Sequence, residues 1–175
     1  MSDSEQPEWF GAWGRLWNPH RMAYIQGESK PRHEGEGEDC PFCVSPAEPM
    51  ESSLVFGRGE LVYGVMNLYP YNVGHVMVCP YRHVSDYTDL TAPEVGELGL
   101  FTQRAMTTLR EVSGAQGFNL GMNQGSVAGA GIAGHLHQHI VPRWGGDTNF
   151  LPIISGTRSM SQLLVDTCAL LREAW

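Results

Sequence analysis

Short apolar runs separated by turn-forming residues fill the middle of the chain from Ser53 onward. The runs Leu54–Phe56 and Leu61–Met66 flank the glycine-containing segment 57–60, which is typical of a β-hairpin. Each later run is short, rich in β-branched or aromatic residues, and bounded by turn residues. Further strands are therefore expected over 75–81, 118–122 and 135–142.

Two segments carry the period of an amphipathic helix instead. Thr91 and Glu94 have the spacing of a capping box, and apolar residues then recur on one side as far as Ser113-Gly114. A second helix is expected over Met160–Leu171. Strands that can pair through short turns, with a long helix between two of them, predict an α+β fold.

The segment before the strands has a different character. Trp9, Trp13 and Trp17 recur every fourth residue, which predicts one face of a short helix. Packing in the core or in a dimer interface is the preferred interpretation of this face over ligand binding. Residues 26–39 are rich in glycine and charge without any period, and they predict a mobile loop.

The length of 175 residues suffices for one domain with a substantial core, and the apolar content of 42% is that of a folded protein. We interpret 1–175 as a single domain. It divides into an N-terminal helix and mobile loop over 1–39, a core over 40–145 and a C-terminal extension with a helix over 146–175.

The formal net charge of −8 argues against non-specific nucleic-acid binding, which relies on basic surfaces. No apolar run approaches the roughly 18 residues of a membrane span, so no membrane association is expected. The acidic N-terminus lacks the features of a secretory signal, which predicts a cytoplasmic location. In a reducing cytosol the four cysteines are expected to be thiols or metal ligands rather than disulfides.

His135, His137 and His139 alternate along one expected strand. Side chains two residues apart share a strand face about 7 Å apart, so the three imidazoles are expected to line one face. Such a face fits either metal binding or nucleophilic attack on phosphorus. The glycine-rich loop Gly125–Gly134 favours the second, because backbone N–H groups there can cradle phosphate oxygens.

The pattern His135-x-His137-x-His139 followed by Ile140-Val141 resembles the signature of the histidine triad (HIT) superfamily of nucleotide hydrolases and transferases. The similarity covers roughly residues 40–145, and within the superfamily it is greatest to the diadenosine tetraphosphate (Ap4A) phosphorylase-like branch. The resemblance implies a HIT-like fold, with an antiparallel sheet of about five strands, a long helix and a C-terminal helix. It also implies a homodimer.

The resemblance assigns roles to matching residues. His137 is the expected nucleophile, and His139 and His75 match positions that orient it or contact phosphate. Asn67 matches a ribose or base contact. The residues expected along the phosphate pocket are Asn123, Gln124, Gly125 and Ser126.

Two positions near the triad complete the expected phosphate site. Arg143 can pair with a phosphate oxygen in bidentate fashion, although an ordinary solvated arginine is an equally good interpretation. The superfamily commonly has Gly-Gln-Ser/Thr shortly before the triad, whereas this chain has Gly129–Ala133 without a hydroxyl or side-chain amide. Backbone amides or Ser126 must then contact the phosphates.

Cys40 and Cys43 have the spacing that lets two thiolates bind one tetrahedral ion. A redox pair is the alternative, but no thioredoxin-like βαβ pattern surrounds them. The resemblance to HIT proteins with the same motif implies that His83 and His135 complete a closed, structural zinc site. No organic cofactor is expected.

These features predict nucleotidyl transfer on dinucleoside polyphosphates through a nucleotidyl-histidine. By branch resemblance the acceptor is inorganic phosphate, which makes the chain an Ap4A phosphorylase that forms ADP and ATP. A first alternative uses water at the same site, as a dinucleoside polyphosphate or nucleoside phosphoramidate hydrolase. The others are a nucleotide-binding sensor with little turnover and a zinc hydrolase whose ligands are the histidine strand.

Overall fold

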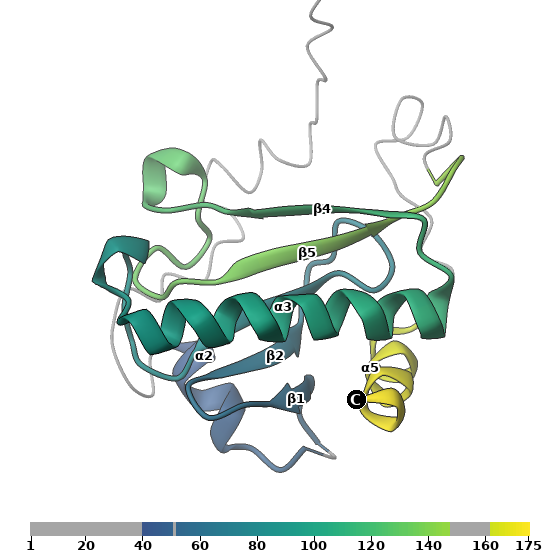
Figure 1. Ribbon diagram of the computed structural model, residues 1–175, viewed down its shortest axis with the longest axis horizontal. Coiled ribbons are helices and arrows are strands. Elements are labelled where there is room, and N and C mark those ends of the chain that lie inside the picture. Colours follow the sequence, from purple (N-terminus) through teal and green to yellow (C-terminus); the bar gives the residue numbers. More distant parts are fainter. Residues whose placement is uncertain (1–39, 51, 148–161) are drawn as a thin grey trace, which may run out of the picture.

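A five-stranded antiparallel sheet with one long helix across it forms the centre of the structure (Figure 1). The structure is a computed structural model, and it describes residues 40–50, 52–147 and 162–175. The spatial order of the strands is β1-β2-β3-β5-β4. Their bounds are β1 Val55–Arg58, β2 Val62–Met66, β3 Val76–Pro80, β4 Gly117–Met122 and β5 Gln138–Arg143. The expected α+β fold with about five antiparallel strands is confirmed. The tryptophan helix and the charged loop predicted over 1–39 lie outside the described residues.

The helical elements occupy the connections and the C-terminal segment. Their bounds are α2 Pro41–Val44, η3 Ser45–Ala47, η4 Tyr87–Asp89, α3 Ala92–Ser113, η5 Ser126–Ala128 and α5 Leu164–Ala174. In Figure 1, α3 runs across the sheet and α5 lies beside one end of it. Within the described part of the chain, no helix is long and apolar enough to cross a membrane.

Helix α3 begins and ends where the sequence predicts. Both hydrogen bonds of the Thr91–Glu94 capping box are present, and Gly114 closes the helix in the left-handed conformation at φ 64°. Arg82 adds a 2.8 Å ion pair to the Glu94 carboxylate. The buried face of α3 packs on the sheet, and the apolar core between them includes Leu98, Ala105, Leu109, Val76, Val78 and Ile140.

The first hairpin turn is shorter than predicted. Strand β1 continues through Gly57 and Arg58, which pair with Gly64 and Tyr63 of β2. The chain then turns over 59–61, where the N–H groups of Glu60 and Leu61 both donate to the carboxylate of Glu97 at 2.7 Å. These two hydrogen bonds hold the turn against α3. Glu97 lies 36 residues after Leu61, so no pattern near the turn predicts them.

Strand β5 begins at Gln138, three residues later than the strand predicted over 135–142. Its ladder with β3 ends at the pair Val78–Gln138, and the ladder with β4 ends at Met122–Gln138. Just before the strand, the N–H of Leu136 donates to the carbonyl of Val84 at 2.6 Å, outside β3. His135 and His137 therefore precede the strand and are not held in its pleat.

Helix α5 is displaced toward the C-terminus relative to the predicted helix, Met160–Leu171. It ends at Ala174, and the following Trp175 packs its ring on Phe101 of α3 at a centroid distance of 4.5 Å. Leu171 is fully buried in the same core. These tertiary contacts stabilise the last turn, so the helix covers 164–174.

Candidate active site and metal site

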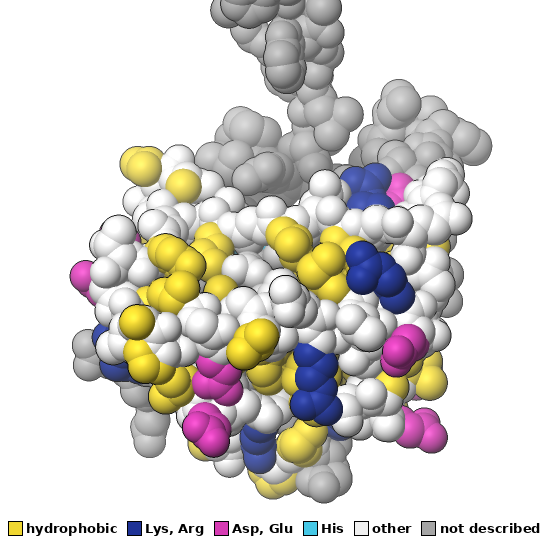
Figure 2. All heavy atoms as spheres, viewed as in Figure 1, with side chains coloured by type: hydrophobic (Ala, Val, Ile, Leu, Met, Phe, Trp, Pro, Cys, Tyr) yellow, Lys and Arg dark blue, Asp and Glu magenta, His cyan; other side chains and the backbone are white. Residues whose placement is uncertain are grey.

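The histidines of the described chain divide into two neighbouring clusters, which corrects the single histidine face predicted from strand alternation. The rings of His83 and His135 lie 5.1 Å apart and face two cysteines. The rings of His137 and His139 lie 5.0 Å apart, and that of His75 lies 5.1 Å from His139. On the face that α3 covers, no described histidine side chain is visible (Figure 2).

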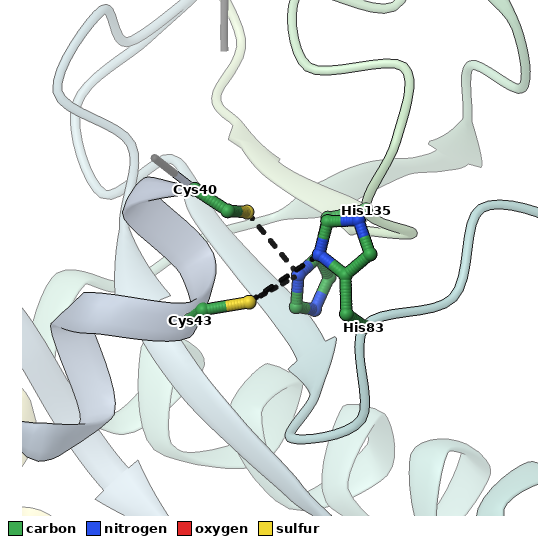
Figure 3. Close-up of side chains that lie close together, drawn as sticks. All are labelled: Cys40, Cys43, His83 and His135. Atoms are coloured by element: carbon green, nitrogen blue, oxygen red, sulfur yellow. Dashed lines mark hydrogen bonds between the residues drawn. The ribbon is translucent and has the colours of Figure 1, made fainter. Parts of the chain in front are cut away.

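The first group, here called the metal cluster, consists of Cys40, Cys43, His83 and His135. The two cysteines come from the start and the body of α2, His83 follows β3, and His135 precedes β5. Figure 3 shows the four side chains converging on one point. Their ligand atoms all lie within 4.8 Å of one another. The structure thus brings together the two cysteines of the motif and the two histidines that the family resemblance implied, in a group that could hold a metal ion.

The distances in the metal cluster fit a tetrahedral ion. The Sγ atoms of the cysteines lie 3.3–3.5 Å from the Nδ1 atoms of the two histidines. Zinc bonds of about 2.3 Å to sulfur and about 2.0 Å to nitrogen imply a sulfur–nitrogen separation of roughly 3.5 Å. The Nε2–H of His135 donates to the Pro80 carbonyl at 2.9 Å, which leaves Nδ1 as the ligand atom.

The second group, the histidine cluster, consists of His75, His137 and His139. His137 is buried, and its Nδ1 lies 2.8 Å from the carbonyl oxygen of His135. A carbonyl only accepts, so Nδ1 carries the proton of the neutral ring and Nε2 holds the free lone pair. Burial lowers the pKa of His137, while the hydrogen bond to His135 opposes that shift. The ring is therefore mostly neutral at pH 7, with the lone pair of Nε2 unprotonated.

A chain of hydrogen bonds fixes the other two rings. The backbone N–H of Tyr71 donates to Nδ1 of His75 at 2.9 Å, so His75 carries its proton on Nε2. That Nε2–H donates to Nδ1 of His139 at 2.9 Å, which places the proton of His139 on Nε2. Burial is the largest cause that lowers the pKa of His75 to about 3 and that of His139 to about 4.

The predicted ribose or base contact, Asn67, lies beside this chain. Its Nδ2 is 3.3 Å from Nδ1 of His75, and its Oδ1 accepts from the N–H of Tyr69 at 2.9 Å. The side chain is thus anchored on the loop between β2 and β3 with its amide toward His75. The structure brings Asn67 to the histidine cluster.

The predicted phosphate-pocket residues follow β4. That strand ends opposite Gln138, so the chain leaves the sheet at the level of His137 before entering 123–126. Gln124 accepts a 2.9 Å hydrogen bond from the N–H of Tyr87, which ties this segment to η4. Ser126 begins η5 and is exposed. Asn123 and Gly125 are half-buried beside it.

Arg143 lies at the other end of β5, paired with Gly117, and the structure does not bring it to the histidine cluster. Its guanidinium donates to Asp147 at 2.6 and 2.9 Å and to Asn119 at 2.9 Å. This arrangement favours a structural role for Arg143 over the predicted phosphate contact. Five residues of β5 separate Arg143 from His137, and all three of its guanidinium nitrogens already donate to Asp147 or Asn119.

Two aromatic residues of the site were not predicted from the sequence. The Phe42 ring lies 4.9 Å from that of His137, and the Tyr71 ring stacks 5.7 Å from that of His139. Phe42 lies within the cysteine motif, and Tyr71 lies between Asn67 and His75, two site residues predicted from the sequence. An aromatic residue in such a segment gives no sign of which ring it will contact.

Comparison with known proteins identifies the architecture. A family model described as HIT domain matches residues 48–146. The protein named AP-4-A phosphorylase from Mycobacterium tuberculosis (strain CDC 1551 / Oshkosh) is 49% identical over 163 residues, which cover 92% of this chain and 84% of that protein. The chain belongs to the HIT domain family. The family resemblance stated from the triad and its surrounding motifs is confirmed.

Other HIT proteins are similar over shorter stretches. The protein named bifunctional bis(5'-adenosyl)-triphosphatase/adenylylsulfatase FHIT from Arabidopsis thaliana is 38% identical over 107 residues, or 61% of this chain and 56% of that protein. Among solved structures, a Zn-bound histidine triad family protein from Mycobacterium smegmatis matches with a TM-score of 0.61 and 28% identity. It covers 77% of this chain and 91% of its own.

Proposed function

We propose that this HIT protein transfers a nucleotidyl group from Ap4A to inorganic phosphate through a covalent intermediate on His137. The observation that carries the proposal is the Nδ1–H of His137 on the His135 carbonyl at 2.8 Å, which leaves a bare Nε2 in a buried, neutral ring. The relative named AP-4-A phosphorylase supports phosphate as the acceptor.

In the first step, Nε2 of His137 attacks the α-phosphorus of Ap4A. An N–P bond forms, the bond to the bridging oxygen breaks, and ATP leaves. The attacking imidazole gains positive charge as the N–P bond forms, and its Nδ1–H donates more strongly to the His135 carbonyl. In the second step an oxygen of inorganic phosphate attacks the same phosphorus, the N–P bond breaks, and ADP is released.

His139 lies beside the nucleophile with its proton on Nε2, because His75 donates to its Nδ1. We assign to His139 a hydrogen bond to a phosphate oxygen of the substrate, and to His75 the orientation of His139. Asn67 contributes a ribose or base contact next to His75. Asn123, Gln124, Gly125 and Ser126 form the phosphate edge of the pocket through their backbone and side-chain donors.

The metal that we assign to Cys40, Cys43, His83 and His135 is zinc. Four protein ligands leave no open position, so the ion joins α2 to the segment before β5 and activates no water. The thiols that this site requires fit a reducing, cytoplasmic compartment. A single domain over 1–175 is part of the same proposal.

We also propose a homodimer that uses the edge of β4. Among the described strands, β4 pairs only with β5, so its other edge is open, and Leu120 on it is 50% exposed. The opposite edge, β1, is bordered by α5, where Arg172 donates to the Val55 carbonyl at 2.8 Å. Sedimentation of wild type and a Leu120→Lys variant tests this assembly, since the lysine must favour the monomer.

The function is tested by incubating the purified protein with Ap4A, with and without inorganic phosphate, and separating the products. Phosphate-dependent ADP and ATP are expected. Phosphate-independent AMP and ATP, or two ADP, identify a hydrolase instead, and no turnover under either condition contradicts the Ap4A assignment.

The His137→Ala variant is the matched test of the nucleophile. It must retain one metal ion per chain and lose turnover together with covalent labelling by radioactive adenylate. A variant that keeps turnover excludes His137 as the nucleophile. Turnover that survives His137→Ala and is abolished by chelation supports the zinc hydrolase alternative.

A further inference from the structure

Phe42 stands between the two cysteines of the metal cluster and contacts the nucleophile of the histidine cluster. Its side chain is buried, with 6% exposed. The ring centroid lies 4.9 Å from that of His137 at an interplanar angle of 39°, and 5.6 Å from that of His135 at 70°. One side chain of α2 therefore touches both a metal-cluster histidine and the proposed nucleophile.

The position of Phe42 depends on the residues around it. Helix α2 contains four residues, far fewer than the roughly 12 to 15 that an isolated helix needs to be stable in water. The helix is held by tertiary contacts instead: the cysteines on both sides of Phe42 face His83 and His135, as Figure 3 shows. The buried hydroxyl of Tyr63 also donates to the Phe42 carbonyl at 2.6 Å.

The hydrogen bond from His137 to the His135 carbonyl fixes one nitrogen of the ring but leaves rotation of the ring about that contact. A neighbouring aromatic face restricts this rotation by packing, since interior side chains lie at close-packed distances. Restricting the rotation of the His137 ring matters for the proposed reaction, because a misplacement of about 1 Å between reacting atoms can lower the rate about 100-fold.

We propose that Phe42 is a positioning residue that connects the metal cluster to the His137 ring. The cysteines fix α2, α2 fixes Phe42, and Phe42 holds the plane of His137 so that Nε2 points at the incoming phosphorus. The metal cluster has a second connection to His137: the carbonyl of His135 accepts from Nδ1 of His137 and so fixes the tautomer of that ring. The kinetic part of this inference rests on the proposed function, whereas the structural part does not.

The inference is tested with Phe42→Leu and Phe42→Met, which keep an apolar side chain and remove the ring. A matched control is Phe56→Leu, which removes a buried ring that packs on Phe101 and Trp175 instead. Three quantities are measured for each protein. They are the bound zinc per chain, the single-turnover rate of adenylyl-enzyme formation together with kcat and KM, and the histidine side-chain ¹⁵N–¹H spectrum.

Both Phe42 variants are expected to bind one zinc ion, to form the adenylyl-enzyme about 10- to 100-fold more slowly, and to change KM less than about threefold. The Nδ1–H signal of His137 exchanges faster with water than in wild type. The Phe56→Leu control keeps the wild-type rate and signal.

Several results overturn the proposal. An unchanged rate and signal show that the ring does not position His137. A raised KM with unchanged kcat shows that Phe42 contacts the substrate directly. Loss of zinc in both variants shows that Phe42 acts on the metal cluster itself. If wild type fails to turn over Ap4A, the proposed function fails, and the exchange of the His137 signal still decides the role of Phe42.

Discussion

The Nε2 of His75 lies 2.9 Å from the Nδ1 of His139, and this contact gives His139 the tautomer opposite to that of the neighbouring His137. The Nδ1 of His139 accepts a hydrogen bond from His75, and its Nε2 carries the proton of the ring. The Nδ1–H of His137 donates to the His135 carbonyl, and its Nε2 stays bare. A ring that donates through Nε2 and a ring with a bare Nε2, the proposed nucleophile, thus lie side by side, both neutral. The backbone N–H of Tyr71 lies 2.9 Å from Nδ1 of His75, and its donation sets the direction of both hydrogen bonds, from Tyr71 to His75 and from His75 to His139.

Replacing His75 by Phe tests this arrangement. The variant keeps a ring but removes the donor to His139, and the loss of one net hydrogen bond of about 0.5–1.5 kcal/mol predicts a kcat lower by about three- to tenfold. Steady-state kinetics with Ap4A and phosphate measures the change. The control is Tyr69→Phe, a loss of one hydroxyl at a residue that is 67% exposed, and it must match wild type. Equal kcat in all three proteins contradicts the role of His75.

The depressed pKa values predict that acid destabilises the fold. His75 and His139 titrate at about 3 and about 4 in the folded chain, against about 6.5 when unfolded, so the unfolded state binds protons first. Stability is full above about pH 6.5 and is lost as the pH falls toward 4. The hydrogen bond from Arg82 is the largest cause that lowers the pKa of Glu94 to about 2. Protonation of Glu94 therefore costs further stability only below about pH 4.5.

Urea unfolding between pH 8 and pH 5 measures this effect in the window where histidines titrate. A His139→Asn variant retains the metal cluster and should lose less stability over that interval than wild type. The difference expected at pH 5 is on the order of 1–2 kcal/mol. Parallel stability curves for the two proteins rule out a depressed pKa at His139.

The local features of the fold could be predicted because their causes are local. The capping box of Thr91 and Glu94 and the left-handed Gly114 act within a few residues, and α3 has the expected ends. Boundaries set by distant contacts could not be predicted. The segment before β5 is bound by its Leu136 N–H to the Val84 carbonyl outside β3, and α5 is displaced because Trp175 packs on α3.

The site shows the same division. The spacing of Cys40 and Cys43 indicates a shared ion, and the family resemblance supplied the partners that the structure brings together. Strand alternation was wrong for His135, because its ring turns to the cysteines before β5 begins. Which way each imidazole donates depends on the backbone groups of Tyr71 and His135, and no sequence pattern encodes those contacts.

The metal cluster predicts a selective effect of cysteine substitution. Cys43→Ala removes a ligand whose Sγ lies 3.3 Å from His83 and 3.5 Å from His135, so bound zinc should fall well below one ion per chain. The melting temperature should fall with it, because binding to a closed site contributes to folding free energy. Elemental analysis and thermal unfolding measure both. Cys168 is a buried thiol on α5, and the Cys168→Ala control must keep its zinc. Equal metal content in both variants contradicts the assignment of Cys43 as a metal ligand.

Gly57 is required by the ring of Trp175. A Cβ built at Gly57 would lie 2.5 Å from Cε2 of Trp175, closer than real Cβ contacts allow, so Gly57→Ala should destabilise the fold by about 1–3 kcal/mol. In a Trp175→Ala background the same substitution should cost much less, because the opposing ring is gone. Gly96→Ala is the control: it lies inside α3 with no atom within 4 Å of its Cβ, and it should stabilise by about 0.5–1 kcal/mol. Free energies from urea unfolding of all four variants complete the cycle. Additive effects at Gly57 and Trp175 would show that the alanine methyl group does not meet the ring, and the contact between β1 and the end of α5 would then not explain the glycine.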